Sequence, residues 1–456
     1  MDKFEQSVVD EITQLYEKLQ IEKISTREYT ENEVDTEGRS EYARDYARVL
    51  YSSSFRRLQG KMQILGIEST AFYRNRLTHS LEVSQIARSL ARTLSWKCGK
   101  EKEMYSEEEL YLLDAAALAH DIGHPAFGHK GERVLDEIAK LYGSRFEGNA
   151  QNFRVVRKLD RHGSSKEGLN LTYRTLLAIN KYITDEKFEN DKLPEKFMYH
   201  EDFEFLNKFR EKNNINKRTL DVQIIEIADD IAYAVHDLED GLSQGLFTLD
   251  ELCHEIKVFK VDAEKKKKGL SIENRDKAYQ MFEGIVSKIK DDLNDNDKIA
   301  TIQEFSHLLR KKITSKLTDD FVKSITFEKV GGDEKKDKEL CMDVTHRTLC
   351  KILSKIIFKG ATRDSSIALY ELKGEIIIKS LFNIYVNKDV NKKYLLLPPD
   401  YRPEEKAVVE QVARCAIDYI AGMMDTFAIS EFERLTGISY NDINVTNIPE
   451  VIRKAD

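Results

Sequence analysis

Apolar residues recur at helical spacing along most of the chain. Between residues 78 and 97, Leu81, Ile86, Leu90 and Leu94 fall near one face of a helix. Comparable patterns predict helices over 107–121, 130–142, 148–160, 171–182, 219–241, 275–295, 300–312, 345–359 and 404–436. The pattern therefore indicates a predominantly helical protein.

Composition supports this interpretation. The chain has only 6 prolines in 456 residues, and its 41% apolar content is enough for a large core. One apolar run, Glu375 to Ile378, fits a short strand or a helix equally well. We predict an all-α fold with three regions: 1–260 with the candidate site, a charged helical insertion over 261–345, and a helical C-terminal region over 346–456.

Charge and cysteine content exclude several classes of protein. A formal net charge of −8 argues against a protein that wraps nucleic acid. The five cysteines form no C-x-x-C pair, which is typical of reduced thiols in a cytosolic protein. The acidic, amphipathic N-terminus does not resemble a signal peptide, and no stretch approaches 18 apolar residues. We therefore expect a cytoplasmic location and no association with a membrane. Four polar stretches are interpreted as exposed loops or insertions of open role: 160–170, 183–218, 261–276 and 328–340.

Histidines cluster in one part of the chain. The sequence has ten, and four of them fall within about a ninth of its length. These are His79, His120, His124 and His129. Histidine is the commonest transition-metal ligand and the usual proton shuttle near neutral pH, so the cluster indicates a metal site or acid–base chemistry. A lone histidine would more often be a core residue.

Carboxylates complete this chemistry. Asp121 follows a buried apolar helix, where a charge needs a partner or a cation. Asp229 and Asp230 interrupt another apolar helix, and neighbours on a helix point about 100° apart, so one of them can face a metal. Imidazoles combined with carboxylates suit Mn²⁺, Fe²⁺, Co²⁺ or Mg²⁺ better than a structural zinc.

Three long motifs carry a resemblance to a known family. They are R-L-T-H-S-L-E-V around His79, A-L-A-H-D-I-G-H-P-A-F-G-H-K-G-E ending at Glu132, and I-A-D-D-I-A-Y-A-V-H-D-L-E-D starting at Ile227. Together they resemble the HD-domain superfamily and, within it, the deoxyguanosinetriphosphate triphosphohydrolase (dGTPase) family. Further matching pieces extend over residues 40 to 430.

The resemblance implies a multi-helix HD phosphohydrolase fold with a helical C-terminal extension and a metal site within 79–230. It implies hydrolysis of dGTP to deoxyguanosine and inorganic triphosphate (EC 3.1.5.-), by attack of water on the α-phosphorus. The implied metal ligands are His79, His120, Asp121 and Asp229. Asp229 is chosen over Asp230 because the family's aspartate follows an alanine. Mg²⁺ or Mn²⁺ is the expected metal, with Fe²⁺, Co²⁺ and Ni²⁺ open.

The resemblance also implies roles for other side chains. His129 acts as general acid or base, and Glu132 orients and charges its imidazole. The implied substrate contacts are Gln63, Arg76, His124, Asn149, Lys181, Tyr233 and Asp237. The alternatives are a broad-specificity dNTPase, another HD-type nucleotide phosphohydrolase or phosphodiesterase, and a non-catalytic nucleotide sensor. Relatives suggest a homo-oligomer, with a hexamer as one option, and single-stranded DNA or a nucleotide as an effector.

Overall fold

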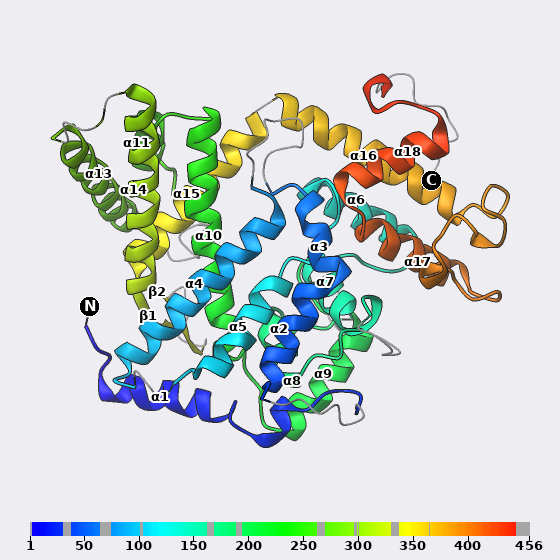
Figure 1. Ribbon diagram of the computed structural model, residues 1–456, viewed down its shortest axis with the longest axis horizontal. Helices are drawn as coiled ribbons and strands as arrows, with labels where there is room; N and C mark the ends of the chain where they lie inside the picture. Colours follow the sequence, from blue (N-terminus) through cyan, green and yellow to red (C-terminus); the bar gives the residue numbers. More distant parts are fainter. Residues whose placement is uncertain are drawn as a thin grey trace. The chain divides into compact units, whose positions relative to one another are not determined.

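A computed structural model describes residues 2–30, 38–63, 74–100, 104–161, 168–187, 194–261, 270–295, 299, 301–329, 337–363 and 365–443 (Figure 1). Helices dominate these ranges, and the sheet they contain has two strands. The prediction of an all-α fold is confirmed. None of the helices within the described ranges is both long and apolar enough to cross a lipid bilayer.

The chain folds into two compact units, each built from separate segments. Unit 1 comprises Met1–Ser25, Leu81–Ala117 and Lys217–Asp364. Unit 2 comprises Thr26–Ser80, Leu118–Asn216 and Ser365–Asp456. The contiguous three-region division expected from the sequence stays a prediction.

Unit 1 is built around a long helix that carries one of the motifs. Its elements are α1 (Gln6–Glu17), η1 (Glu22–Ser25), most of α4 (Arg76–Lys97) and α5 (Glu107–Ala119), α10 (Leu220–Gln244), α11 (Leu249–Lys257), α13 (Ile272–Asn294), α14 (Ile302–Lys323), β1 (Ile325–Lys329), β2 (Lys338–Met342) and α15 (Val344–Arg363). Helix α10 packs on α14, α15 and β2. It starts at a cap where the Thr219 side chain accepts from the Val222 N–H, and it ends at Gly245, whose φ of 71° is left-handed.

Unit 2 holds the remaining elements. They are α2 (Glu41–Tyr51), α3 (Ser53–Arg57), η2 (Leu58–Gly60), α6 (Gly128–Leu141), α7 (Gly148–Arg154), the π-helical turn η3 (Val155–Leu159), α8 (Tyr173–Ile179), α9 (His200–Lys212), α16 (Ser365–Val386), η5 (Lys392–Tyr394), η6 (Pro399–Tyr401), α17 (Val409–Ala421), α18 (Asp425–Thr436) and η7 (Tyr440–Asp442). Helix α16 packs against α6, α17 and α18, and their apolar faces share one core around Phe127, Leu381 and Ile417. This core fixes the start of α6, where two predicted site residues lie.

The structure decides or corrects several sequence expectations. The run from Glu375 to Ile378, for which strand and helix were both open, is helical, because it lies inside the long apolar helix α16. The helix predicted over 404–436 is two helices, α17 and α18, which are separated by Gly422 to Met424. The stretch 183–218, interpreted as a loop, contains the amphipathic helix α9.

The hairpin of β1 and β2 was not predicted. Ile325 pairs with Met342 and Lys329 with Lys338, so the strands occupy both ends of the polar stretch 328–340. Residues 330–336 of that stretch, 162–167 of the stretch 160–170, and 262–269 of the stretch 261–276 lie outside the described residues.

Candidate functional site

The start of α4 brings a histidine and an arginine of the first motif onto one side of the helix. Arg76 and His79 are three residues apart, so they share a face, and both are buried in unit 2. The His79 and His120 rings lie 5.5 Å apart between centroids, and a nitrogen of each lies within 4.8 Å of the other. Two imidazoles at this separation could hold one metal ion between them.

Asp121, directly after His120, is held by positive or protonatable groups. Its Oδ2 accepts a hydrogen bond of 2.6 Å from Arg76, and its Oδ1 lies 2.9 Å from His124 Nδ1 and 3.8 Å from His120 Nε2. Burial opposes ionisation, but the charges of Arg76, His124 and His120 outweigh it and hold the pKa of the carboxyl well below its usual range. The side chain is therefore an ionised carboxylate, with oxygen lone pairs that a cation could share.

The turn that follows Asp121 is fixed by two buried ionisable side chains. Lys61 donates to the backbone carbonyls of His124 and Ala421, and Asp425 accepts from the Phe127 N–H at 3.1 Å. Burial lowers the pKa of Lys61 to about 7, and the nearby charges of Arg57 and Arg76 act in the same direction. These contacts tie the turn to the segment between α17 and α18.

The first turn of α6 carries the predicted acid–base pair. His129 Nδ1 lies 3.3 Å from Glu132 Oε2, and the His129 side chain is 54% exposed while that of Glu132 is 14% exposed. Glu132 Oε1 also accepts the Gly148 N–H at 3.0 Å. Burial disfavours the Glu132 carboxylate, but His129, His124, Lys196 and that N–H lower its pKa below the ordinary value. Glu132 is thus an anion beside an imidazole that reaches solvent.

The two groups of histidines adjoin one another. The rings of His124 and His129 meet edge to face with centroids 6.2 Å apart. Donor atoms of His124, His129 and Glu132 lie within 4.8 Å of each other, so this second group could also bind a cation. A polar line therefore runs within unit 2 from Arg76 and Asp121 through His124 to Glu132.

Lys196 extends this line, and sequence reasoning missed it. Its ammonium lies 2.6 Å from Glu147 Oε1 and 3.6 Å from Glu132 Oε1. Asn149, a predicted substrate contact, donates to the same Glu147 oxygen at 2.8 Å. Lys196 stands in a polar stretch with no motif, where a lysine resembles any other surface lysine. Only the fold brings it to Glu132.

Two other predicted contacts, Gln63 and Lys181, also belong to unit 2. Gln63 follows Lys61 by two residues and is half-buried, and its Oε1 has no hydrogen-bond partner among the described residues. Lys181 is half-buried and follows α8. The roles of both residues stay predictions.

The remaining predicted residues belong to α10 in unit 1. Asp229, Tyr233 and Asp237 recur every four residues and so lie along one face of this helix. Asp229 is half-buried and Asp230 is exposed, and the choice of Asp229 over Asp230 stays a prediction. Because these residues belong to a different unit from His79, a site that they share with unit 2 stays a prediction.

Comparisons with known proteins identify relatives over most of the chain. The family model described as HD domain matches residues 76–234, and the one described as phosphohydrolase-associated domain matches residues 340–434. The chain is 39% identical over 420 residues to deoxyguanosinetriphosphate triphosphohydrolase-like protein 2 of Vibrio cholerae serotype O1, which covers 91% of this chain and 94% of the relative. It is 33% identical to a deoxyguanosinetriphosphate triphosphohydrolase-like protein of Shewanella pealeana, over 86% of this chain and 90% of that protein. A protein of Rickettsia felis with the same description is 31% identical over 90% of this chain and 95% of its own length.

Proposed function

Because this chain belongs to the HD-domain family of deoxyguanosinetriphosphate triphosphohydrolase-like proteins, we propose that it hydrolyses dGTP to deoxyguanosine and inorganic triphosphate. The observation that supports this most is the polar line in unit 2, which sets donors for a metal ion beside a histidine–carboxylate pair. The coarser conclusion, that the protein is a nucleotide phosphohydrolase, follows from the family itself.

The metal ligands in this proposal are His79, His120, Asp121 and Asp229. In unit 2, nitrogens of His79 and His120 lie within 4.8 Å of one another, and the ionised Asp121 carboxylate lies 3.8 Å from His120 Nε2; imidazoles beside a carboxylate suit a divalent cation such as Mg²⁺ or Mn²⁺. When bound, such a cation would polarise the α-phosphate and increase the acidity of water. Asp229 enters from the family resemblance.

His129 supplies the proton in this proposal. The ionised Glu132 stabilises a protonated imidazole beside it, so His129 can donate to the 5′-oxygen as that oxygen leaves. The exposed ring can then regain its proton from solvent. Glu132 is held in place by the Gly148 N–H, so it keeps the imidazole oriented through the cycle.

Cationic side chains would hold the triphosphate. The Arg76 guanidinium is buried and lies on Asp121, so a phosphate close to that carboxylate would also be close to Arg76. Lys196 is 44% exposed beside Glu132, where its charge offsets that of the carboxylate and is accessible to an anionic substrate. Neither residue selects the base. Selection of guanine is therefore assigned only by the family resemblance.

Product analysis tests the proposal. The purified protein is incubated with each dNTP and with GTP, in Mg²⁺ and then in Mn²⁺, in water enriched in ¹⁸O. We expect deoxyguanosine from dGTP, with the label in inorganic triphosphate, because water attacks phosphorus. His79→Ala protein purified in the same way controls for contaminating phosphatases.

Other products would point to the alternatives. The same reaction with all four dNTPs would keep the mechanism and indicate a broad-specificity dNTPase. Deoxyguanosine monophosphate and pyrophosphate would contradict the proposed cleavage and favour another phosphohydrolase. No turnover with either metal, with nucleotides and single-stranded DNA added as effectors, would favour a nucleotide sensor.

A further inference from the structure

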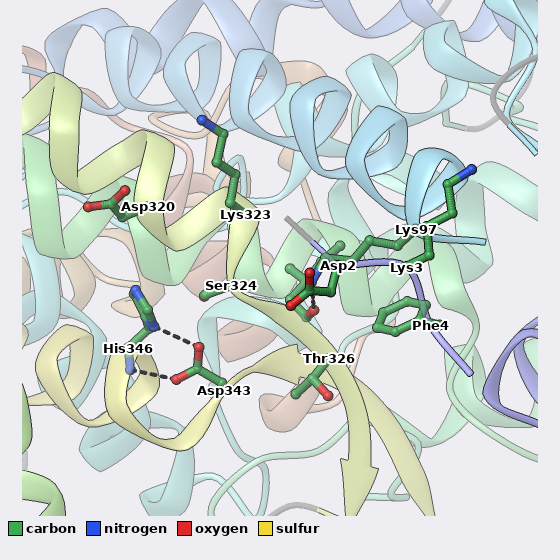
Figure 2. A pocket seen from close by; sticks show the side chains of 11 residues that line it. Asp2, Lys3, Phe4, Lys97, Asp320, Lys323, Ser324, Thr326, Asp343 and His346 are labelled. Atoms are coloured by element: carbon green, nitrogen blue, oxygen red, sulfur yellow. Dashed lines mark hydrogen bonds and ion pairs between the residues drawn. The ribbon is translucent and has the colours of Figure 1, made fainter. Parts of the chain in front are cut away.

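A second feature of the molecule lies within unit 1 and contains none of the predicted site residues. It is a cavity of about 490 Å³, a size typical of small-molecule sites. Its walls come from the N-terminal segment, the end of α4, the end of α14, the start of β1 and the start of α15. Figure 2 shows Lys97 and Phe4 on one side of the pocket, and His346 with Asp343 on the opposite side.

Lys97 is the unusual residue of this pocket. It is only 9% exposed, yet its ammonium donates one hydrogen bond, to the Ile325 carbonyl at 2.6 Å. It also lies over the Phe4 ring, 5.2 Å from the centroid. Within the described ranges, no carboxylate lies within ion-pair distance of it. Buried charges are normally paired, so a buried ammonium with two unused N–H groups that faces a pocket is suited to pairing with an anion.

The acidic residues around the pocket attract Lys97 only from beyond ion-pair distance: burial lowers the pKa of its ammonium, and the charges of Asp343 and Asp2 offset this only in part. Asp343 lies 2.7 Å from His346 Nδ1 and accepts the N–H groups of Thr345 and His346. Asp320 is paired with Lys316 on the same helix. Asp2 also lines the pocket, together with Lys3 and with Lys323, whose charge is paired with Asp319.

We infer that this pocket binds a small molecule bearing an oxyanion, a carboxylate or a phosphate group, against the Lys97 ammonium. Such a group has enough acceptor oxygens for both remaining ammonium protons, and the Thr326 side chain lines the same cavity. Binding of the anion is strongly favourable because it neutralises an ammonium that is already desolvated. The volume leaves room for a ligand larger than inorganic phosphate.

The chain contains a local probe for this site. Its one tryptophan, Trp96, precedes Lys97, and the pocket residue Lys3 lies over the Trp96 ring at 5.4 Å. We would titrate the full chain with inorganic phosphate and, separately, with succinate, and follow Trp96 fluorescence against sodium chloride of equal ionic strength. A saturable change with phosphate alone identifies phosphate as the bound group, and one with succinate alone identifies carboxylate. No saturable change with either would overturn the proposal.

Variants make the test specific. Lys97→Met should weaken the response at least tenfold, because it keeps the length of the side chain and removes the charge. Lys277→Met, in α13 of the same unit but outside the pocket lining, should leave the response unchanged. An undiminished response in Lys97→Met would contradict the assignment.

A measurement on the unaltered protein covers the case in which Lys97→Met does not fold. The rate of Lys97 acetylation by an amine-reactive ester, followed by mass spectrometry, should fall severalfold when phosphate or succinate is bound. A rate that stays the same at saturating anion would overturn the proposal. None of these readouts depends on turnover.

Discussion

The two ends of the polar line in unit 2 differ in their access to water. At one end, Arg76, His79 and Asp121 are at most 6% exposed, Arg76 donates to Asp121, and the His79 ring lies 5.5 Å from that of His120. At the other end, the His129 side chain is 54% exposed, and Glu132 connects it to the backbone of α7. The line is therefore closed at Asp121 and open at His129.

This difference separates two kinds of chemistry. A buried carboxylate is costly to desolvate unless a positive charge lies beside it. A closed, buried site of this kind therefore suits the binding of a cation. A proton donor must regain its proton each cycle, which suits an exposed imidazole with a fixed carboxylate beside it. We therefore assign binding to the closed end and proton transfer to the open end, and the experiments below test that division.

The largest effect should come from the closed end. Removing the His79 imidazole with His79→Ala takes away a proposed metal ligand, so we expect a loss of bound metal and about 10³-fold or more in kcat/KM. Metal content is measured by elemental analysis alongside turnover. His200→Ala is a matched control, since His200 is also a histidine of unit 2 but lies beside Asp185. If His79→Ala kept its full metal content, the assignment of metal binding to the closed end would be wrong.

At the open end, His129→Ala should reduce kcat about 10²-fold, the usual contribution of a general acid, while metal content stays at the level of the unaltered protein. Glu132→Gln keeps the shape of the side chain and removes the charge, so it should give a smaller loss of kcat. If His129→Ala also lost its metal, the second donor group of His124, His129 and Glu132 would have to be a metal site instead.

Between the two ends, the turn at His124 depends on Lys61. Lys61→Met leaves the buried carbonyls of His124 and Ala421 without their donor, which should cost about 2 kcal/mol in the free energy of unfolding. Urea denaturation measures this, with the exposed Lys208→Met as the control, for which a change under about 0.5 kcal/mol is expected. An equal effect of both substitutions would show that the turn is held by other contacts.

The stability that Lys61 contributes should also depend on pH. The pKa of Lys61 is about 7 in the folded protein against 10.5 for an unperturbed lysine, so between these values the unfolded chain holds the extra proton. The free energy of unfolding contributed by Lys61 should therefore rise as the pH increases from 7 towards 10.5. Unfolding measured at pH 7, 8 and 9 should show a growing advantage of the unaltered protein over Lys61→Met. A constant difference would contradict the lowered pKa.

Sequence reasoning succeeded where structure is local. Residues 120–132 lie in one short stretch, so the order His120, Asp121, His124, His129, Glu132 already implied that they would be neighbours. Helix periodicity likewise identified α4, α5 and α10. Long, regular apolar patterns leave few alternatives, which is why these elements could be predicted.

The residues it missed act through long-range contacts. Lys61 reaches a carbonyl 360 residues away along the chain, and Lys196 reaches Glu132 from a polar stretch that was interpreted as a loop. The sequence around either lysine does not differ from that around an ordinary surface lysine, because a contact with a distant part of the chain leaves no periodic signal in the sequence. The same holds for β1 and β2, whose five-residue strands are too short to be distinguished from loops.

The smallest effect tests whether the open end depends on fine positioning. A Cβ on Gly148 would lie 3.2 Å from His124 Nε2 and in van der Waals contact with Glu132 Oε1 at 3.4 Å, so Gly148→Ala must displace the His124 ring slightly. We expect kcat to fall about fivefold, close to 1 kcal/mol, with metal content unchanged. Alanine at the start of α7 costs the fold little, because alanine favours the helix. Gly284→Ala, in α13 with open space around it, should leave kcat unaltered. If both glycine variants turned over like the unaltered protein, the position of the His124 ring beside the open end would not matter for turnover.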